Sequence, residues 1–423
     1  MSGSSSLVLN QGYQAITECR ISGDKKLIPV LSLGDQALTG VFPKSPTDKI
    51  TRGPLELVWS QRSGLLQLAH SFDAGEMYGE GYGYRSGLNA SMVEHLTSKA
   101  KRLERICGLT SGDGILDIGS SDATLLKAFT VKGIRRIGMD PSAEKFRSYY
   151  TDGIQLIPDF FSTKKFHEAT TKVRPKLITS VAMFYDLEDP SGFVSEIASL
   201  LPDGGIWHFE QSYMPTMLRQ NSYDTICHEH LEYYSLKPVL ELLDHAGLLP
   251  VEVLMNSTNG GSFAVTAVKG RSSYPKEAKI IDWLLEEEER MGLGTSAPFL
   301  AFAERVFHHR ESLRRLIHSL RNDGKRILAY GASTKGNVIL QFCGFGPNEI
   351  EAVVDVNPAK HGRFTPGSGI PILSEEEGKK RNPDYYLVLP WHFRDFILRK
   401  EAPYLARGGR MIFPMPEIEI VTA

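Results

Sequence analysis

Short apolar runs separated by amphipathic segments occupy the centre of the chain. Each run is followed by polar or glycine-containing positions, which is typical of buried strands in a parallel sheet. The apolar positions of residues 91–107 have helical spacing instead. The pattern therefore predicts an α/β domain over residues 76–270, closed by a hairpin turn at 259–262. The strand-like runs span residues 115–118, 134–139, 154–161, 177–184 and 205–210.

The same alternation returns at the C-terminal end of the chain. Residues 271–322 have helical spacing and carry a run of four glutamates, which indicates connecting helices with a solvated face. Beyond them, apolar runs near residues 326–330, 351–355, 385–390 and 409–413 predict a second, Rossmann-like sheet over residues 323–423. Residues 1–75 contain short strand-like runs broken by glycine and proline, and predict a small, loop-rich β module.

Composition limits the kinds of partner. The chain has 423 residues, a hydrophobic fraction of 41% and a formal net charge of −2, so nothing favours nucleic acid or an anionic membrane, and a small molecule is the expected partner. The first residues lack a signal-peptide pattern and no apolar run is long enough to span a bilayer. Four scattered cysteines suit a reducing compartment, so we expect a cytoplasmic protein.

The junction between the first central strand and its helix has the form of a nucleotide site. Gly119 follows the strand and lets the backbone approach a ligand closely. Asp140 ends the next strand, about 20 residues further on, where such folds place the carboxylate that binds ribose hydroxyls. An ordinary strand-to-helix turn with surface aspartates remains the alternative.

The residues of this loop favour S-adenosylmethionine over a dinucleotide. Ser121 and Thr124 stand where a dinucleotide fingerprint has glycines, and Asp117 and Asp122 would repel a diphosphate. The same carboxylates would attract an ammonium and a sulfonium. A nicotinamide site is the competing prediction. The residues expected to hold the donor, including an Asp-Phe pair for the adenine, are Asp117, Gly119, Ser121, Asp122, Asp140, Asp159 and Phe160.

Residues 223–234 contain the densest group of titratable side chains. A histidine base operates near neutral pH when a partner fixes its tautomer, and His228, Glu229 and His230 are adjacent here. A metal site fits this spacing less well than two histidines four residues apart on a helix would. A polar surface turn is the third possibility.

Zinc is not expected in the N-terminal module. Cys19 and Ser22, with Ser60 and Ser63, lie where a pair of zinc knuckles would place four cysteines. One thiol and three hydroxyls are a poor ligand set for zinc, so we predict no metal and expect Cys19 to be a small buried apolar residue.

Two further segments are candidates for contact with the second substrate. Residues 78–89 are rich in glycine and aromatic residues and form either a lid with Tyr82, Tyr84 and Arg85 facing ligand or an apolar connection between domains. The loop 331–336 carries Ser333 and Lys335 before a predicted helix, which suits a phosphate or diphosphate. A Rossmann-like domain that serves only as scaffold is the alternative there.

Together these segments resemble the sugar-nucleotide C-methyltransferases of deoxysugar biosynthesis, the enzymes that place a methyl branch on carbon 3 of a dTDP-4-keto-6-deoxyhexose. The resemblance spans essentially the whole chain. It implies a central class I methyltransferase domain with a Rossmann-like sheet, a C-terminal Rossmann-like domain that helps hold the sugar nucleotide, and an N-terminal zinc-binding domain. Its most specific motifs are residues 33–36, 84–87, 226–234, 259–262, 330–336 and 357–358, together with the donor loop.

The resemblance also implies roles for individual residues. His230, with Glu229 beside it, matches the base that removes the proton alpha to the ketone, and Tyr84 matches a tyrosine near the substrate. Contacts with the acceptor are expected from Tyr82, Arg85, His228, Ser333 and Lys335. The chain departs from the family at the zinc cysteines, at Ala123 and at Asp186.

The sequence leaves the activity open between two classes. One is C-methylation by a monomer or weak homodimer, and the other is a non-catalytic or redox protein that binds nucleotide sugars through its C-terminal domain.

Overall fold

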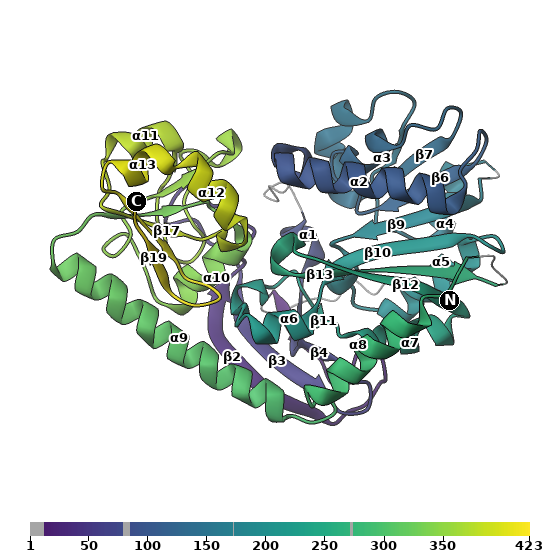
Figure 1. Ribbon diagram of the computed structural model, residues 1–423, viewed down its shortest axis with the longest axis horizontal. Helices are drawn as coiled ribbons and strands as arrows, with labels where there is room; N and C mark the ends of the chain where they lie inside the picture. The colour runs from purple at the N-terminus through teal and green to yellow at the C-terminus, as the bar shows by residue number, and fades with distance from the viewer. Residues whose placement is uncertain (1–11, 79–84, 172, 271–273) are drawn as a thin grey trace.

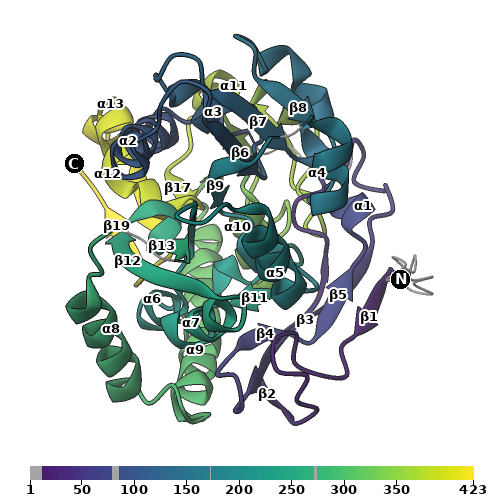
Figure 2. The same ribbon diagram turned by 90° about the vertical axis from the view of Figure 1, so that its right-hand side faces the viewer.

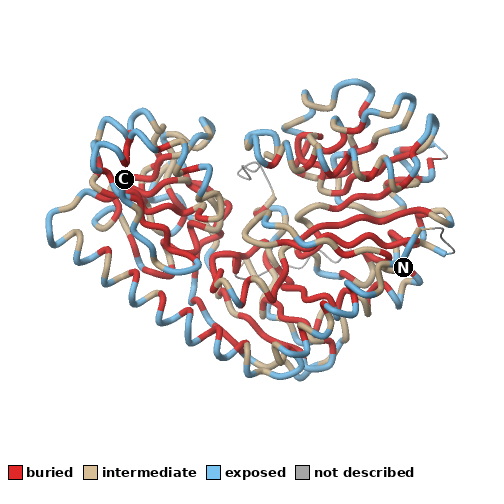
Figure 3. Tube along the Cα trace, in the orientation of Figure 1, coloured by how far each residue is buried: buried red, intermediate tan, exposed pale blue. Residues whose placement is uncertain are grey.

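Two α/β domains lie side by side, with N-terminal strands beneath their junction and a long helix beneath the C-terminal domain (Figure 1). The structure is a computed structural model that describes residues 12–78, 85–171, 173–270 and 274–423. Buried segments follow the strands of both domains, and exposed segments follow the outer helices and loops (Figure 3). The predicted α/β class is confirmed.

The central sheet has seven strands in the order β12-β13-β10-β9-β6-β7-β8. Neighbouring strands pair in parallel, except that β13 is antiparallel to both β10 and β12. The strands are β6 (Gly114–Ile118), β7 (Arg135–Met139), β8 (Gln155–Ile157), β9 (Pro175–Val181), β10 (Ile206–Ser212), β12 (Leu248–Asn256) and β13 (Ser262–Lys269). Each predicted central strand is therefore present, although β8 and β9 end earlier than predicted, at Ile157 and Val181. Residues 257–261 connect the last two strands, and the turn predicted at 259–262 overlaps this connection.

Helices cover both faces of this sheet. Successive strand residues point to opposite faces, so Ile115 packs in one apolar cluster and Leu116 in another. The cluster around Ile115 includes residues of α2 (Ala90–Cys107) and α3 (Thr124–Ala128). The cluster around Leu116 includes residues of α4 (Thr163–Ala169), α5 (Pro190–Leu200) and α7 (Leu236–His245). Because helices cover both faces of the sheet, most residues of its central strands are apolar and buried.

The N-terminal module is completed by a strand from the central domain. Its main sheet has the order β11-β4-β3-β2, and a separate pair joins β1 to β5. These strands lie along one side of the molecule (Figure 2). They are β1 (Tyr13–Ala15), β2 (Leu27–Ala37), β3 (Arg52–Ser60), β4 (Leu66–Leu68), β5 (His70–Phe72) and β11 (Glu232–Tyr233), followed on the chain by the short α1 (Ala74–Met77). Because β11 directly follows the His-Glu-His segment, this segment is fixed to the N-terminal sheet.

The C-terminal domain has a six-stranded sheet in the order β16-β15-β14-β17-β18-β19, in which only β19 among the described strands is antiparallel to its neighbour. The predicted Rossmann-like sheet is thus present. Its elements are β14 (Ile327–Tyr330), α10 (Thr334–Phe342), β15 (Val353–Asp355), β16 (Ile372–Ser374), α11 (Glu375–Lys380), β17 (Tyr385–Val388), α12 (Arg394–Lys400), α13 (Ala402–Ala406), β18 (Arg410–Phe413) and β19 (Glu419–Val421).

Three helices connect and brace the domains. They are α6 (Met214–Arg219), α8 (Ala278–Arg290) and α9 (Ala297–Asn322). The ring of Phe299 on α9 lies 5.4 Å from that of Trp59 on β3, so the long helix packs against the N-terminal sheet. Within the described ranges, no helix combines the length and apolarity that crossing a bilayer requires.

Candidate active site

A cavity of about 460 Å³ opens at the carboxyl ends of the central strands. Gly119, Ser121 and Asp140 line it, as do Asp117 and Phe160. Gly119 has φ +75°, and a Cβ atom there would lie 3.0 Å from Cγ of Met183, so a side chain at this position would crowd the cavity wall. Five of the seven residues predicted to hold the donor therefore surround one cavity.

The walls of this cavity are acidic. No lysine, arginine or histidine is present among the described residues that line it. The carboxylic acids in the lining are Asp117, Asp140, Asp186, Glu188, Asp189, Glu196 and Glu210. Such walls attract the ammonium and sulfonium of S-adenosylmethionine and would repel the diphosphate of a dinucleotide. The residues present thus fit the predicted methyl donor.

Two of these carboxyl groups are fixed by hydrogen bonds within the donor loop. The hydroxyl of Thr179 donates to Oδ1 of Asp117 at 2.6 Å, and burial raises the pKa of Asp117 to about 7. Asp140 accepts the backbone N–H of Ser121 at 2.8 Å and that of Ser142 at 2.7 Å. Asp140 therefore has a set orientation at the cavity wall before any ligand arrives.

Asp122 and Asp159 are not among the cavity residues. Asp122 accepts the backbone N–H of Gly87 at 3.1 Å and pairs with Arg85 at 3.3 Å. It therefore connects the donor loop to the segment before α2. Asp159 pairs with Lys165 at 2.5 Å. Roles for these two aspartates in donor binding stay predictions.

The aromatic segment before α2 is described only at its two ends. Tyr82 and Tyr84 lie outside the described residues, whereas Tyr78 and Ser86 on either side of them line the cavity. Arg85 donates to the hydroxyl of Tyr149 at 2.7 Å and stacks over its ring. The contacts of Arg85 are thus with the protein, and its predicted contact with the acceptor stays a prediction.

The three side chains of the His-Glu-His segment point to different surroundings. His228 is buried with its ring 4.5 Å from that of Phe72, and burial lowers its pKa to about 3. Glu229 accepts the hydroxyl of Thr39 at 3.2 Å, and burial raises its pKa. His228 thus packs in the core, and Glu229 faces the N-terminal module.

His230 has the environment of a base with a fixed tautomer. Its Nδ1 lies 2.8 Å from the carbonyl oxygen of Thr225. Because a carbonyl oxygen can only accept, Nδ1 carries the hydrogen and Nε2 keeps a free lone pair. Burial, followed by the nearby Lys335, lowers the pKa of His230 to about 3, so the imidazole is neutral at neutral pH. His230 is not a lining residue of the donor cavity, although its neighbour Leu231 is.

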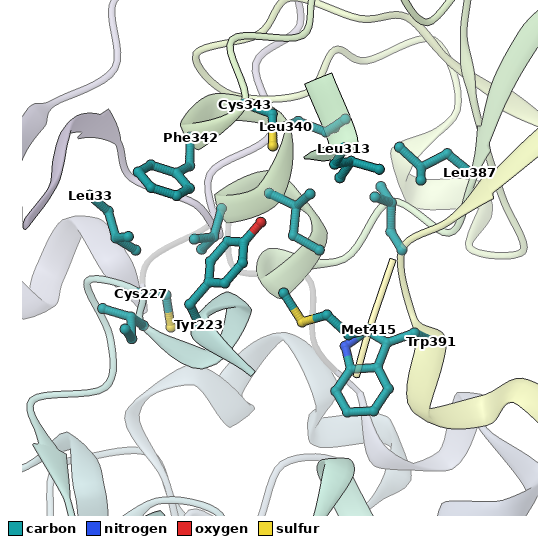
Figure 4. Close-up of a cluster of buried hydrophobic side chains, with 14 of the residues drawn as sticks. Leu33, Tyr223, Cys227, Leu313, Leu340, Phe342, Cys343, Leu387, Trp391 and Met415 are labelled. Carbon is teal, nitrogen blue, oxygen red and sulfur yellow. The ribbon is translucent and has the colours of Figure 1, made fainter. Parts of the chain in front are cut away.

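The loop that carries His230 packs against the C-terminal domain. The ring of Tyr223 lies 5.4 Å from that of Phe342, and Figure 4 shows both beside Cys227. Nε1 of Trp391, also labelled there, donates to Asp224 at 2.8 Å. The base loop is thus held between two domains.

The two residues predicted to bind a diphosphate have separate roles in this structure. Ser333 caps α10, where its hydroxyl accepts the backbone N–H of Gly336 at 3.0 Å. Nζ of Lys335 instead donates to the carbonyl oxygen of Asn259 at 2.9 Å. Because Asn259 lines the donor cavity, Lys335 reaches from the C-terminal domain to the edge of that cavity.

Sequence reasoning did not select Asp224, Glu210 or Asn259. Glu210 ends a predicted strand at the carboxyl edge of the sheet, and the rule that identified Asp140 would have identified it. Asn259 belongs to a predicted turn and to a family motif, but neither assigns it a ligand or a partner. No local pattern distinguishes Asp224 from the other polar residues of its segment.

The N-terminal module retains two knuckle-like turns. Cys19 and Ser60 begin them, and in each the backbone carbonyl accepts the N–H four residues later at 2.9 Å. Sγ of Cys19 lies 3.2 Å from Oγ of Ser63, so a contact between thiol and hydroxyl joins the turns. Across the described residues no group of three or more histidine, cysteine, aspartate or glutamate side chains is placed to hold a metal. One thiolate with serine hydroxyls does not fit zinc.

Addition of a metal chelator should accordingly leave the thermal stability of the chain unchanged. We expect a melting temperature that shifts by less than about 1 °C on addition of a chelator, because the contact between Cys19 and Ser63 joins the turns without metal. Zinc content and thermal unfolding of purified protein are the measurements. The matched variant Ser22→Cys/Ser60→Cys/Ser63→Cys should gain zinc and become sensitive to chelator. Stoichiometric zinc in the unaltered chain would contradict this expectation.

Comparisons with known proteins agree with this arrangement. Three family models match, described as putative zinc binding domain (residues 19–78), methyltransferase domain (92–253) and C-methyltransferase C-terminal domain (257–416). The C-methyltransferase NovU of Streptomyces niveus is 31% identical over 411 residues, which is 96% of this chain and 97% of NovU.

Solved structures match part of the chain with lower similarity. The N-methyltransferase NodS of Bradyrhizobium japonicum, in complex with S-adenosyl-L-homocysteine, is 15% identical with a TM-score of 0.32, and covers 43% of this chain and 89% of its own. A putative methyltransferase structure that includes the Haloferax volcanii activator Trm112 is 18% identical with a TM-score of 0.34, and covers 43% and 95% respectively. The similarity to NovU extends over nearly the full length of both chains. The chain therefore belongs to the C-methyltransferase family and is an S-adenosylmethionine-dependent methyltransferase with a class I fold.

Proposed function

We propose that this enzyme methylates a nucleotide-linked keto-deoxysugar at the carbon alpha to its ketone. The observation that carries the proposal is the hydrogen bond from Nδ1 of His230 to Thr225, which leaves Nε2 free as a base. A carbon beside a ketone is acidic enough for such a base to remove its proton. A neutral imidazole beside an acidic donor cavity thus supports C-methylation of an activated carbon.

The proposed mechanism assigns each part of the site a task. S-adenosylmethionine supplies the methyl group on a positively charged sulfur. Asp140 and the backbone at Gly119 hold the donor at the carboxyl edge of the sheet. Nε2 of His230 removes the alpha proton of the acceptor, and the resulting enolate carbon forms the new bond with the methyl group. Positioning of the two reactants replaces a bimolecular encounter and contributes much of the rate.

The acceptor is proposed to lie between the central and C-terminal domains. His230 and Lys335 come from these two domains and both adjoin residues of the donor cavity. The carboxyl group of Glu229 accepts a hydrogen bond from Thr39 of the N-terminal module. Because this bond fixes the residue next to His230, Glu229 is proposed to position His230. Contacts of Tyr82, Tyr84 and Ser333 with the sugar nucleotide are part of this proposal.

The proposal is tested with purified enzyme, S-adenosylmethionine and a set of 4-keto sugar nucleotides. We expect S-adenosylhomocysteine and a new carbon-bound methyl signal by NMR with at least one acceptor. Gly119→Val is the control, because its side chain would meet Met183 at a backbone position with φ +75°, and it should form no product. Absence of product with every keto sugar nucleotide would contradict the proposal. Reduction of the sugar with a nicotinamide cofactor would favour the redox alternative.

A further inference from the structure

Three basic side chains from two domains gather next to the donor cavity. His230 lies on the base loop, Lys335 on the first turn of α10, and His392 directly after Trp391. A Cβ atom at Gly40 would lie within 4 Å of both Glu229, the neighbour of His230, and Thr334, the neighbour of Lys335. Trp391, which precedes His392, donates to Asp224 of the base loop. The three side chains therefore belong to one interface, and Lys335 contributes, after burial, to lowering the pKa of both His230 and His392. The cluster is separate from the acidic lining of the cavity.

The position of Lys335 is defined by two groups of the central domain. Its Nζ donates to the carbonyl oxygen of Asn259 at 2.9 Å. The buried Asp224 interacts favourably with its charge and opposes the lowering of the pKa of Lys335 by burial. An ammonium has three N–H groups, and the bond to Asn259 uses one of them. The side chain of Lys335 is thus fixed in position, and its Nζ has N–H groups that the bond to Asn259 does not use.

Removal of the alpha proton places negative charge on the ketone oxygen of the acceptor. A donor aimed at such an oxygen accelerates the step because it stabilises the charge only as the charge develops. The described lining of the donor cavity offers no basic side chain for this purpose. The cluster of His230, Lys335 and His392 beside the cavity offers basic side chains. Nδ1 of His392 is buried without a hydrogen-bond partner among the described residues.

We propose that Lys335 is a catalytic residue that binds the ketone oxygen of the acceptor opposite His230, with His392 as a second donor. This inference rests on the proposed function. Nε2 of His230 takes the alpha proton, the electron pair of the C–H bond forms the enolate, and the charge on oxygen is held by Lys335. The enolate carbon then bonds to the methyl group, the S–CH₃ electron pair returns to sulfur, the ketone reforms, and His230 releases its proton to water.

This role differs from the phosphate contact that the sequence predicted for Lys335. A phosphate-binding lysine would weaken nucleotide binding when replaced, whereas an enolate-stabilising lysine would slow proton removal. Lys360 is a matched control from another segment, because its Nζ donates at 2.6 Å to the carbonyl oxygen of Ala332, which lies just before α10. It packs over the ring of Phe42 rather than towards His230.

Exchange of the alpha proton with solvent measures the proposed step without methyl transfer. The full-length enzyme is incubated in D₂O with S-adenosylhomocysteine and dTDP-4-keto-6-deoxyglucose, and deuterium incorporation is followed by NMR. We expect Lys335→Met to slow exchange by about 10²–10³-fold, as for loss of one oxyanion donor. Lys335→Arg should recover part of the rate, and Lys360→Met should remain within about twofold of the unaltered enzyme. Binding of dTDP, measured by calorimetry, should stay within about threefold for Lys335→Met, which also reports that this variant is folded.

The outcomes separate the two hypotheses. Loss of dTDP binding in Lys335→Met, with exchange preserved at saturating sugar nucleotide, would overturn the catalytic role and support the phosphate contact. Unchanged exchange and unchanged binding would overturn both roles. Absence of exchange and of methylation in the unaltered enzyme would instead contradict the proposed function itself.

Discussion

Replacement of His230 by alanine is expected to lower kcat for methyl transfer by about 10²–10⁴-fold, the usual contribution of a general base. The hydrogen bond from Nδ1 to Thr225 leaves Nε2 as the free base, and alanine removes it. Donor affinity should survive, because His230 does not line the donor cavity. Steady-state kinetics and calorimetry with S-adenosylmethionine are the measurements.

His228→Asn is the matched control for this variant. His228 packs against Phe72 in the core, so its replacement should lower the melting temperature. It should lower kcat far less than His230→Ala does. A His230→Ala enzyme that keeps kcat within tenfold of the unaltered value would contradict the assignment of the base.

The pH dependence gives a second readout of His230. An unperturbed histidine base would lose activity as the pH falls through about 6.5. Burial and Lys335 lower the pKa of His230 to about 3, so Nε2 becomes protonated only as the pH falls through that lower value. We therefore expect that protonation of His230 causes no fall of kcat/KM near pH 6.5. If kcat/KM did fall there, and the fall disappeared when His230 was replaced, the lowered pKa would be contradicted. The groups that face the ring are Lys335, Tyr185 and the carbonyl of Thr225.

Glu210→Leu is expected to lower the free energy of unfolding by about 3–5 kcal/mol, the usual cost of leaving a buried ionic partner uncompensated. Glu210 is 2% exposed and accepts Lys99 at 2.9 Å, Asn256 at 2.8 Å and the His95 ring at 2.7 Å. Burial alone would raise the pKa of Glu210, but His95 and Lys99 outweigh it and lower the pKa to about 2. Urea denaturation measures the change.

The double variant Glu210→Leu/Lys99→Met tests the cause. Lys99 is 8% exposed, so it has little access to water once its carboxylate is removed. Removing both charges should recover most of the lost stability, since the two side chains are in direct contact and their effects are not additive. Equal destabilisation in the single and double variants would show that packing, and not charge, is responsible.

The sequence predicted the parts of this fold that depend on local pattern. Apolar runs identified β6 and β7, because strands that are covered on both faces lack the alternation of polar and apolar residues that half-exposed strands have. The donor loop was found for a related reason, since Gly119 and Asp140 take their positions from strand ends. Both signals are contained within a few residues of the chain.

The directions of individual side chains were not predictable in this way. The pairing of Asp122 with Arg85 is one example, because no local pattern indicated it, and the predicted donor contact of Asp122 stays a prediction. Glu229 meets Thr39, which lies 190 residues away along the chain, and Lys335 meets Asn259, which lies 76 residues away. Such pairings depend on how complete domains dock, and no spacing in a single sequence records that docking.

The late position of β11 in the chain affects folding during translation. During translation β2, β3 and β4 leave the ribosome long before β11, so the nascent N-terminal sheet has an open edge along β4. An open edge is a site for pairing with other chains and for aggregation. Residues 232 and 233, which follow His230, close this edge, so a polypeptide truncated before residue 230 would lack both the proton acceptor and the strand that protects the N-terminal sheet.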